Sequence, residues 1–227
     1  MIDFINSKNE NLYNEIIEKT SIELIEFSQW GSITENNNAR IFYTKTVNPY
    51  ACFTHELLHI KYYHLGLKCP KFIDNETLEV TITFLFNQLS HHKFFEEFCS
   101  LGFDEKNFLD NGRENEFNDK TIKYINKLEG EFAKKGKIEL DINLLMLYIS
   151  LKSPNDSSEK TLNYINRLKL IGGKNFFLKI DLILEDWRKE TTLNSCSTLA
   201  KLYKTCNYTN IGFYLDNRDE IIYANSI

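Results

Sequence analysis

The sequence predicts an α+β fold that is predominantly helical, with a small sheet in its first part and a β-hairpin at its end. Apolar residues recur at helical spacing behind capping residues along most of the chain. Residues 39–46 are β-branched and aromatic, which is typical of a strand. Residues 211–223 have the pattern of two short strands that turn at Asn217 and Arg218.

A polar stretch at residues 111–120 is the best candidate for a linker. We therefore expect a first domain over residues 1–112 and a helical C-terminal region over residues 113–227, forming one globule or two. A chain of 227 residues with 42% hydrophobic and 14% aromatic residues is long and apolar enough to bury a core, so we expect it to be folded throughout.

Charge and composition exclude several classes of partner. A net charge of −5 gives no electrostatic reason to expect binding to nucleic acid. The N-terminus lacks the basic start and apolar centre of a signal peptide, and no apolar run approaches the roughly 18 residues that span a bilayer. The five cysteines form no C-x-x-C pair, as in free thiols of a reducing compartment. We expect a cytoplasmic protein without a membrane partner, and its oligomeric state stays open.

Local signals predict the elements in order. Ser7 and Glu10 form a capping box before a helix that leads into a strand near residues 22–27, and residues 30–38 are rich in turn formers. Asp74 and Asn75 can cap a helix that begins at Glu76. Later helices are expected from Asn118 to Gly136, from Asp141 through Leu151, from Asp156 to Gly172, over Phe176–Trp187 and over Leu193–Tyr203.

The pattern His-Glu-x-x-His at residues 55–59 carries the clearest chemistry. Asn48 and Pro49 suit a helix start and Gly66 suits its end, so the motif lies within a helix. Residues four apart on a helix lie about 6 Å apart on one face, which lets His55 and His59 reach one Zn²⁺. Glu56 then lies beside the metal, where its carboxylate can act as general base on a water molecule. Two incidental histidines on a solvated helix are the alternative.

The third metal ligand has several candidates. Glu79 is the first choice, because Glu79, Thr83, Asn87 and His91 form a polar row along an otherwise apolar helix. Glu76, His91 and His92 remain open as ligands. We also expect His92 to stabilise the oxyanion of a tetrahedral intermediate, with exposure beside an acidic pair as the alternative. His64 does not fit a metzincin pattern and is expected at the surface.

The strand at residues 39–46 directly precedes the motif helix, and it has two interpretations. It can be an edge strand that pairs with an extended substrate backbone, or an ordinary strand inside the sheet.

The motif, the strand before it and the helix after it resemble HExxH zincin metallopeptidases of the gluzincin type. The chain is most similar to the ImmA/IrrE-type intracellular proteins of bacteria, over roughly residues 35–110. In that group a glutamate opening an E-x-x-A-N-x-F-A pattern completes the zinc site, and Glu79 matches this spacing with Ile82 and Thr83 in place of alanine and asparagine. The resemblance implies a zincin-like core at residues 1–112 and zinc-dependent cleavage of a peptide or protein substrate.

Two further functions remain open. The chain can be a regulatory or protein-binding module that keeps a non-catalytic zinc site, or a helical interaction protein without any metal. A Glu56→Gln variant separates the first from a peptidase, because it removes the general base and leaves the ligands in place.

Overall fold

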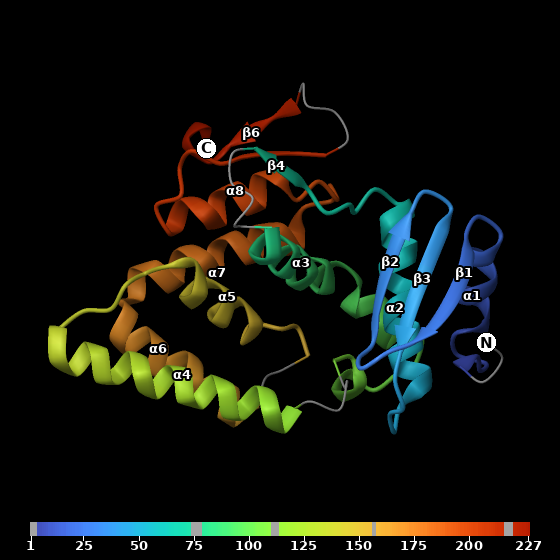
Figure 1. Cartoon of the computed structure of the whole chain (residues 1–227), viewed down its shortest axis with the longest axis horizontal. Helices are drawn as coiled ribbons and strands as arrows, with labels where there is room; N and C mark the ends of the chain where they lie inside the picture. The colour runs from blue at the N-terminus through green and yellow to red at the C-terminus, as the bar shows by residue number, and fades with distance from the viewer. Residues whose placement is uncertain (1–3, 74–78, 110–113, 156–157, 216–219) are drawn as a thin grey trace. The chain divides into compact units, whose positions relative to one another are not determined.

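The computed structural model describes residues 4–73, 79–109, 114–155, 158–215 and 220–227 (Figure 1). The chain divides into two compact units, residues 1–66 with 94–115 and residues 67–93 with 116–227. The sequence predicted one boundary after residue 112, whereas residues 67–93 group with the second unit. The division falls inside one continuous helix, α3 (Glu79–Ser100), which therefore contributes to both units.

The first unit contains helix α1 (Glu10–Ile17) and a three-stranded sheet of β1 (Ser21–Glu26), β2 (Gly31–Glu35) and β3 (Asn38–Tyr43). The strand order is β1-β3-β2, with β1 parallel and β2 antiparallel to β3. Sequence analysis placed only a turn-rich segment where β2 lies. A two-residue turn joins β2 to β3, and Asn36 in that turn has a φ of 53°, a conformation that asparagine tolerates better than most residues.

The strand before the motif helix is β3, and it is the central strand of this sheet. It pairs with β1 on one side and with β2 on the other, and Ile41 and Ala39 on it are buried. The interpretation of this strand as a substrate-pairing edge is therefore wrong. Among the described strands, β1 and β2 are the two edges of the sheet, each with a neighbour on one side only.

Helix α2 (Pro49–His64) carries the motif, as predicted. Proline occupies its first turn, and Gly66 just beyond its end has a φ of 106°, a left-handed value that glycine adopts without strain. The helix packs against β2 and β3 (Figure 1). Phe53, Leu57 and Leu58 are fully buried, so the helix is fixed on several sides.

The second unit is mostly helical. Its helices are α4 (Glu114–Lys135), α5 (Ile142–Ser150), α6 (Glu159–Gly172), α7 (Lys174–Lys189) and α8 (Cys196–Thr205). Its sheet has the order β4-β5-β6, formed by β4 (Lys71–Ile73), β5 (Gly212–Tyr214) and β6 (Ile222–Tyr223). The predicted C-terminal hairpin is thus confirmed as the antiparallel β5–β6 pair, and β4 adds a strand that sequence analysis missed.

Some predicted helix starts agree with the structure and others are wrong. The capping box predicted at Ser7 and Glu10 does not form the start of α1, whose N-cap residue is Asn9. Helix α4 begins at Glu114, so Asn118 lies inside it and does not cap it. The Asp141 carboxylate accepts a hydrogen bond from the Leu144 backbone N–H at 2.9 Å and caps α5. At the start of α6, the cap is Ser158, whose hydroxyl accepts from the Thr161 N–H at 3.2 Å. The predicted caps at Asp74, Asn75 and Asp156, the candidate ligand Glu76 and the turn at Asn217 and Arg218 lie outside the described residues.

The α+β, predominantly helical prediction is confirmed in the described ranges. Helix α4 already begins at Glu114, inside the stretch predicted as a linker. None of the helices in the described part of the chain combines the length and the apolar character that a bilayer span requires.

Candidate metal centre

The two motif histidines face each other on α2. Their Nε2 atoms lie 3.2 Å apart. Two nitrogen ligands at about 2.0–2.1 Å from a tetrahedral Zn²⁺ are separated by about 3.3 Å, so this spacing is the one that a shared metal ion requires. The pair follows directly from the i, i+4 spacing on a regular helix.

A third histidine joins this pair. His91 lies on α3 and is 2% exposed, and one ring nitrogen from each of His55, His59 and His91 lies within 4.8 Å of the others. Phe94, one turn later on α3, contacts both motif histidines, with ring centroids 5.5 Å from His55 and 4.7 Å from His59. This packing sets the position of α3 relative to the motif, and His91 lies on the same stretch of helix.

Aromatic side chains enclose the motif histidines. The Phe108 ring lies 4.7 Å from the His55 ring and 5.7 Å from Phe94, and both phenylalanines are buried. The Phe108 backbone also lies close to the His55 ring and acts on the pKa of His55 in the direction opposite to burial. Phe108 thus supplies an apolar wall and places its backbone beside the ring.

Burial keeps these histidines neutral. The pKa of His55 is lowered well below its ordinary value by burial first and by the nearby His59 second. Burial alone lowers the pKa of His59 to about 4. Neutral imidazole is the form that binds a metal, so neither ring has to lose a proton at pH 7 before it can act as a ligand.

Glu56 is the other buried titratable group of the motif. It is 6% exposed, and its Oε2 accepts a hydrogen bond of 2.8 Å from the Ser32 hydroxyl on β2. Burial raises the pKa of Glu56 to about 7, while the bond from Ser32 acts in the opposite direction. A carboxyl group with this pKa can accept and release a proton near neutral pH.

Glu79, the predicted third ligand, does not lie near this group. It is the first residue of α3 and is exposed. Twelve residues separate it from His91, which corresponds to about 18 Å along a helix. Among the described residues, His91 is the third member of the group that could hold a metal ion, and it is one of the candidates that the sequence left open.

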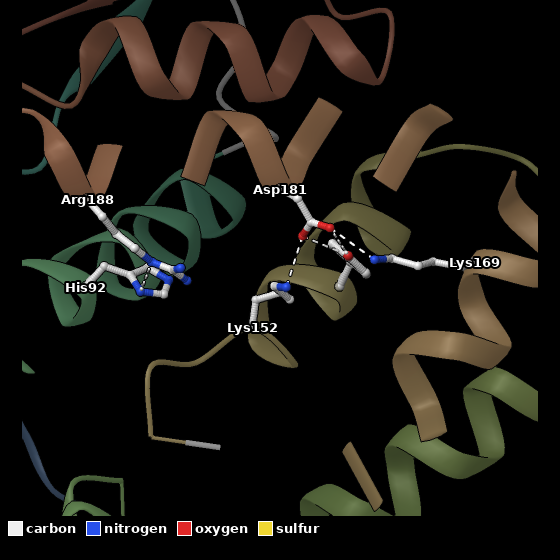
Figure 2. Close-up of polar contacts among 6 residues, drawn as sticks. His92, Lys152, Lys169, Asp181 and Arg188 are labelled. Atoms are coloured by element: carbon white, nitrogen blue, oxygen red, sulfur yellow. Dashed lines mark hydrogen bonds and ion pairs between the residues drawn. The ribbon is translucent and has the colours of Figure 1, made fainter. Parts of the chain in front are cut away.

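The His92 side chain contacts Arg188 on α7 and does not join the three-histidine group. The Arg188 Nε donates a hydrogen bond of 3.2 Å to its Nδ1, as Figure 2 shows. Burial, followed by the charges of Arg188, Lys152 and Lys93, lowers the pKa of His92 to about 3. The structure does not bring His92 together with the motif histidines, so its predicted role at an oxyanion gains no support from this position.

Two residues that contact the motif, Ser32 and Phe108, are not among those that the sequence predicts. Ser32 lies in a segment rich in turn formers, although Ser32, Ile33 and Thr34 have strand propensity. Phe108 acts partly through its backbone, which no side-chain pattern reveals. Comparisons of the chain with known protein families, with curated proteins and with solved structures gave no match.

Proposed function

We propose that this chain is a zinc-dependent metallopeptidase with His55, His59 and His91 as metal ligands and Glu56 as general base. The observation that carries the proposal is the pair of Nε2 atoms 3.2 Å apart beside a buried carboxyl group. An incidental pair of histidines on a solvated helix would be exposed, charged at mildly acidic pH and free to turn apart. These rings are held by aromatic packing and are neutral at pH 7.

The donor set fits zinc. Three imidazoles leave one position of a tetrahedral ion for water or substrate, which is the pattern of catalytic sites, whereas structural sites use four protein ligands. When bound, zinc supplies a Lewis acid that polarises a carbonyl group and lowers the pKa of water.

Glu56 supplies the proton transfers. One carboxylate oxygen is held by the Ser32 hydroxyl, so the other oxygen remains available to take a proton from an attacking water molecule. The same carboxyl group can then deliver the proton to the leaving amine. Burial raises the pKa of Glu56 in the metal-free chain, which places this carboxyl group in the range where a general base can also act as an acid.

Strand β2 supports a peptide as the substrate. It carries Ser32, whose hydroxyl contacts Glu56, and one of its edges has no partner among the described strands. An extended peptide can add to such an edge through backbone hydrogen bonds, which would lay a peptide bond beside the general base. We propose a peptide or protein substrate for the same reason, and a cytoplasmic location from the composition.

Metal content and activity together test the proposal. Protein supplied with zinc and then dialysed should retain about one zinc ion per chain. In Glu56→Gln the zinc should remain, while cleavage of a protein or peptide-library substrate should fall by at least about a hundredfold. Glu18→Gln at the exposed end of α1 removes the same charge and should change neither property.

The outcomes separate the alternatives. Protein that binds no zinc would refute the metal site and with it the peptidase. Stoichiometric zinc without cleavage of any substrate in the wild type would instead favour a regulatory module with a non-catalytic site.

A further inference from the structure

A second polar cluster lies in the second unit, apart from the histidine ligands. It consists of His92 on α3, Tyr148 and Lys152 at and beyond the end of α5, Lys169 on α6, and Asp181 and Arg188 on α7. Figure 2 shows Lys152 and Lys169 approaching Asp181 from opposite sides, with Lys152 on the side of the His92–Arg188 pair.

Asp181 is the only carboxylate in this cluster, and several groups share it. The Asp181 Oδ1 lies 3.1 Å from the Lys152 Nζ, and the Oδ2 lies 3.0 Å from the Lys169 Nζ. Both oxygens also accept from the Tyr148 hydroxyl, at 2.9 and 3.0 Å. Two ammonium groups thus face one negative charge, which leaves an excess positive charge. The three charged side chains are only 25–32% exposed, so solvent screens this excess incompletely.

Arg188 adds a second excess charge. Its Nε donates to the Nδ1 of His92, which must be unprotonated to accept the bond and carries no negative charge. The two terminal nitrogens of the guanidinium bond no residue in the described part of the chain, and the side chain is exposed. Arg188 lies close enough to Glu185 to interact with its charge. The Glu185 carboxylate, however, forms an ion pair with the Lys189 Nζ at 2.5 Å.

Lys93, the remaining cation near His92, is held by backbone carbonyl groups. Lys93 donates to the backbone carbonyls of Trp187 and Glu190 at the end of α7, with the Glu190 carboxylate nearby, and lies over the Trp187 ring. The charges of Lys93, Lys152 and Arg188 all reach the His92 ring. Lys93 has a structural task, and Arg188 and Lys152 retain unused N–H donors.

We propose that Arg188 and Lys152, oriented by His92 and Asp181, form a binding site for a phosphoryl group. The guanidinium fork matches two oxygens of a phosphate, and a second cation favours a dianion over a singly charged carboxylate. The bond to His92 occupies the Nε of Arg188, so the two terminal nitrogens of this exposed side chain are the donors that a phosphoryl group would use. This binding site goes beyond the proposed peptidase and does not depend on it.

Titration of the full chain with inorganic phosphate at constant ionic strength tests the site. Zinc is removed first with a chelator, so that phosphate cannot bind at the histidine ligands. We expect saturable binding of about one phosphate per chain, weakened at least about tenfold in Arg188→Gln and in Lys152→Gln. Lys179→Gln on the same helix α7 removes one exposed positive charge and should change the affinity less than about twofold.

Further measurements keep the test decisive. Acetate should bind at least about tenfold more weakly than phosphate, since it carries one charge. If Arg188→Gln does not fold, as judged by circular dichroism, Arg188→Lys keeps the charge, loses the fork and should still weaken binding. Absence of phosphate binding in the wild type, equal losses in Lys179→Gln and Arg188→Gln, unchanged affinity in Arg188→Lys, or equal binding of acetate would overturn the proposal.

Discussion

Two adjacent residues of α3, His91 and His92, illustrate how the surroundings of an imidazole decide what it can do. His91 is buried and has a nitrogen close to those of His55 and His59. His92 lies among cations, and its Nδ1 lone pair already accepts a hydrogen bond from Arg188. Consecutive residues on a helix differ by about 100° in direction, which is enough to separate the two environments.

The comparison extends to the two clusters as a whole. The histidine group is assembled from neutral rings against phenylalanines, so it gains stability chiefly when a ligand binds. In the cluster around Asp181, the carboxylate is already bonded to Lys152, Lys169 and Tyr148, so these contacts stabilise the fold without a ligand even though a positive charge is left in excess. Substitutions should therefore affect metal affinity in the first cluster and the free energy of unfolding in the second.

The largest effect is expected from His59→Ala. Removal of one of two ligands on α2 should abolish stoichiometric zinc, with a loss of affinity of more than about a hundredfold, beyond that typical of residues that only orient a ligand. Competition with a chelator measures the affinity. His64→Ala on the same helix is the control, because the His64 ring is hydrogen-bonded to the Thr20 hydroxyl at 2.6 Å. Equal zinc affinity in His59→Ala and the wild type would contradict the metal centre.

A second pair of variants decides the third ligand. His91→Ala should weaken zinc binding by at least about tenfold, because two imidazoles from one helical turn hold the ion less firmly than three. Glu79→Gln should leave the affinity unchanged, because Glu79 lies at the exposed start of α3. The opposite pattern would restore Glu79 as the ligand and would mean that α3 is placed differently in the metal-bound protein.

The third prediction concerns the stability of the metal-free protein as a function of pH. Burial raises the pKa of Glu56 from 4.5 to about 7, so the folded chain retains a proton that the unfolded chain has lost between these values. The resulting penalty is absent below pH 4.5 and complete above pH 7. Glu56→Gln should therefore increase the free energy of unfolding at pH 8 by up to about 3 kcal/mol, at about 1.4 kcal/mol for each pH unit.

The Glu56→Gln variant also separates the contribution of Glu56 to the pH dependence of stability from the contribution of the histidines. Burial lowers the pKa of His59 to about 4, so its contribution to stability is complete above pH 6.5 and is lost as the pH falls toward 4. In Glu56→Gln, urea unfolding of the metal-free protein should show stability decreasing steadily over this range. An equal pH profile for wild type and Glu56→Gln would show that Glu56 is not buried in a neutral form.

The smallest effect is expected from Asp181→Asn. The variant keeps the shape of the side chain, but it removes the negative charge between Lys152 and Lys169, and we expect a destabilisation of about 1–2 kcal/mol. The bonds from Lys169, Tyr148 and Lys152 lower the pKa of Asp181 against the effect of burial, so the wild-type advantage should disappear as the solution becomes strongly acidic. Asp186→Asn, exposed on the same helix, should be neutral in thermal unfolding.

Sequence alone was sufficient where the signals are local. The i, i+4 spacing placed His55 and His59 on one face, and Asn48, Pro49 and Gly66 located the ends of α2. The cap at Asp141 was found for the same reason, since a helix start involves neighbouring residues only. Strand β2 was missed because Asn36 and its neighbours suggested a loop, although asparagine is also a good residue for a tight hairpin turn.

The proposed third ligand, His91, could not be deduced, because its place beside the motif histidines depends on how two helices pack. The sequence shows the polar row from Glu79 to His91. The end that lies near the motif histidines is His91, whereas the predicted ligand was Glu79 at the other end. Steps of four residues drift by about 40° around a helix, so a row that starts exposed at Glu79 can end buried at His91. The contact of Ser32 with Glu56 likewise depends on the position of β2 against α2.

The proposed ligand set of three histidines would also determine which other metals compete for the site. Neutral imidazoles bind Ni²⁺ and Cu²⁺ readily, and the stability order of divalent ions places Cu²⁺ above Zn²⁺. Purification on a nickel column can therefore load the protein with nickel, and trace copper can displace zinc during an assay. In the cell, the metal bound at the proposed site would then depend on which ions are available as the chain folds.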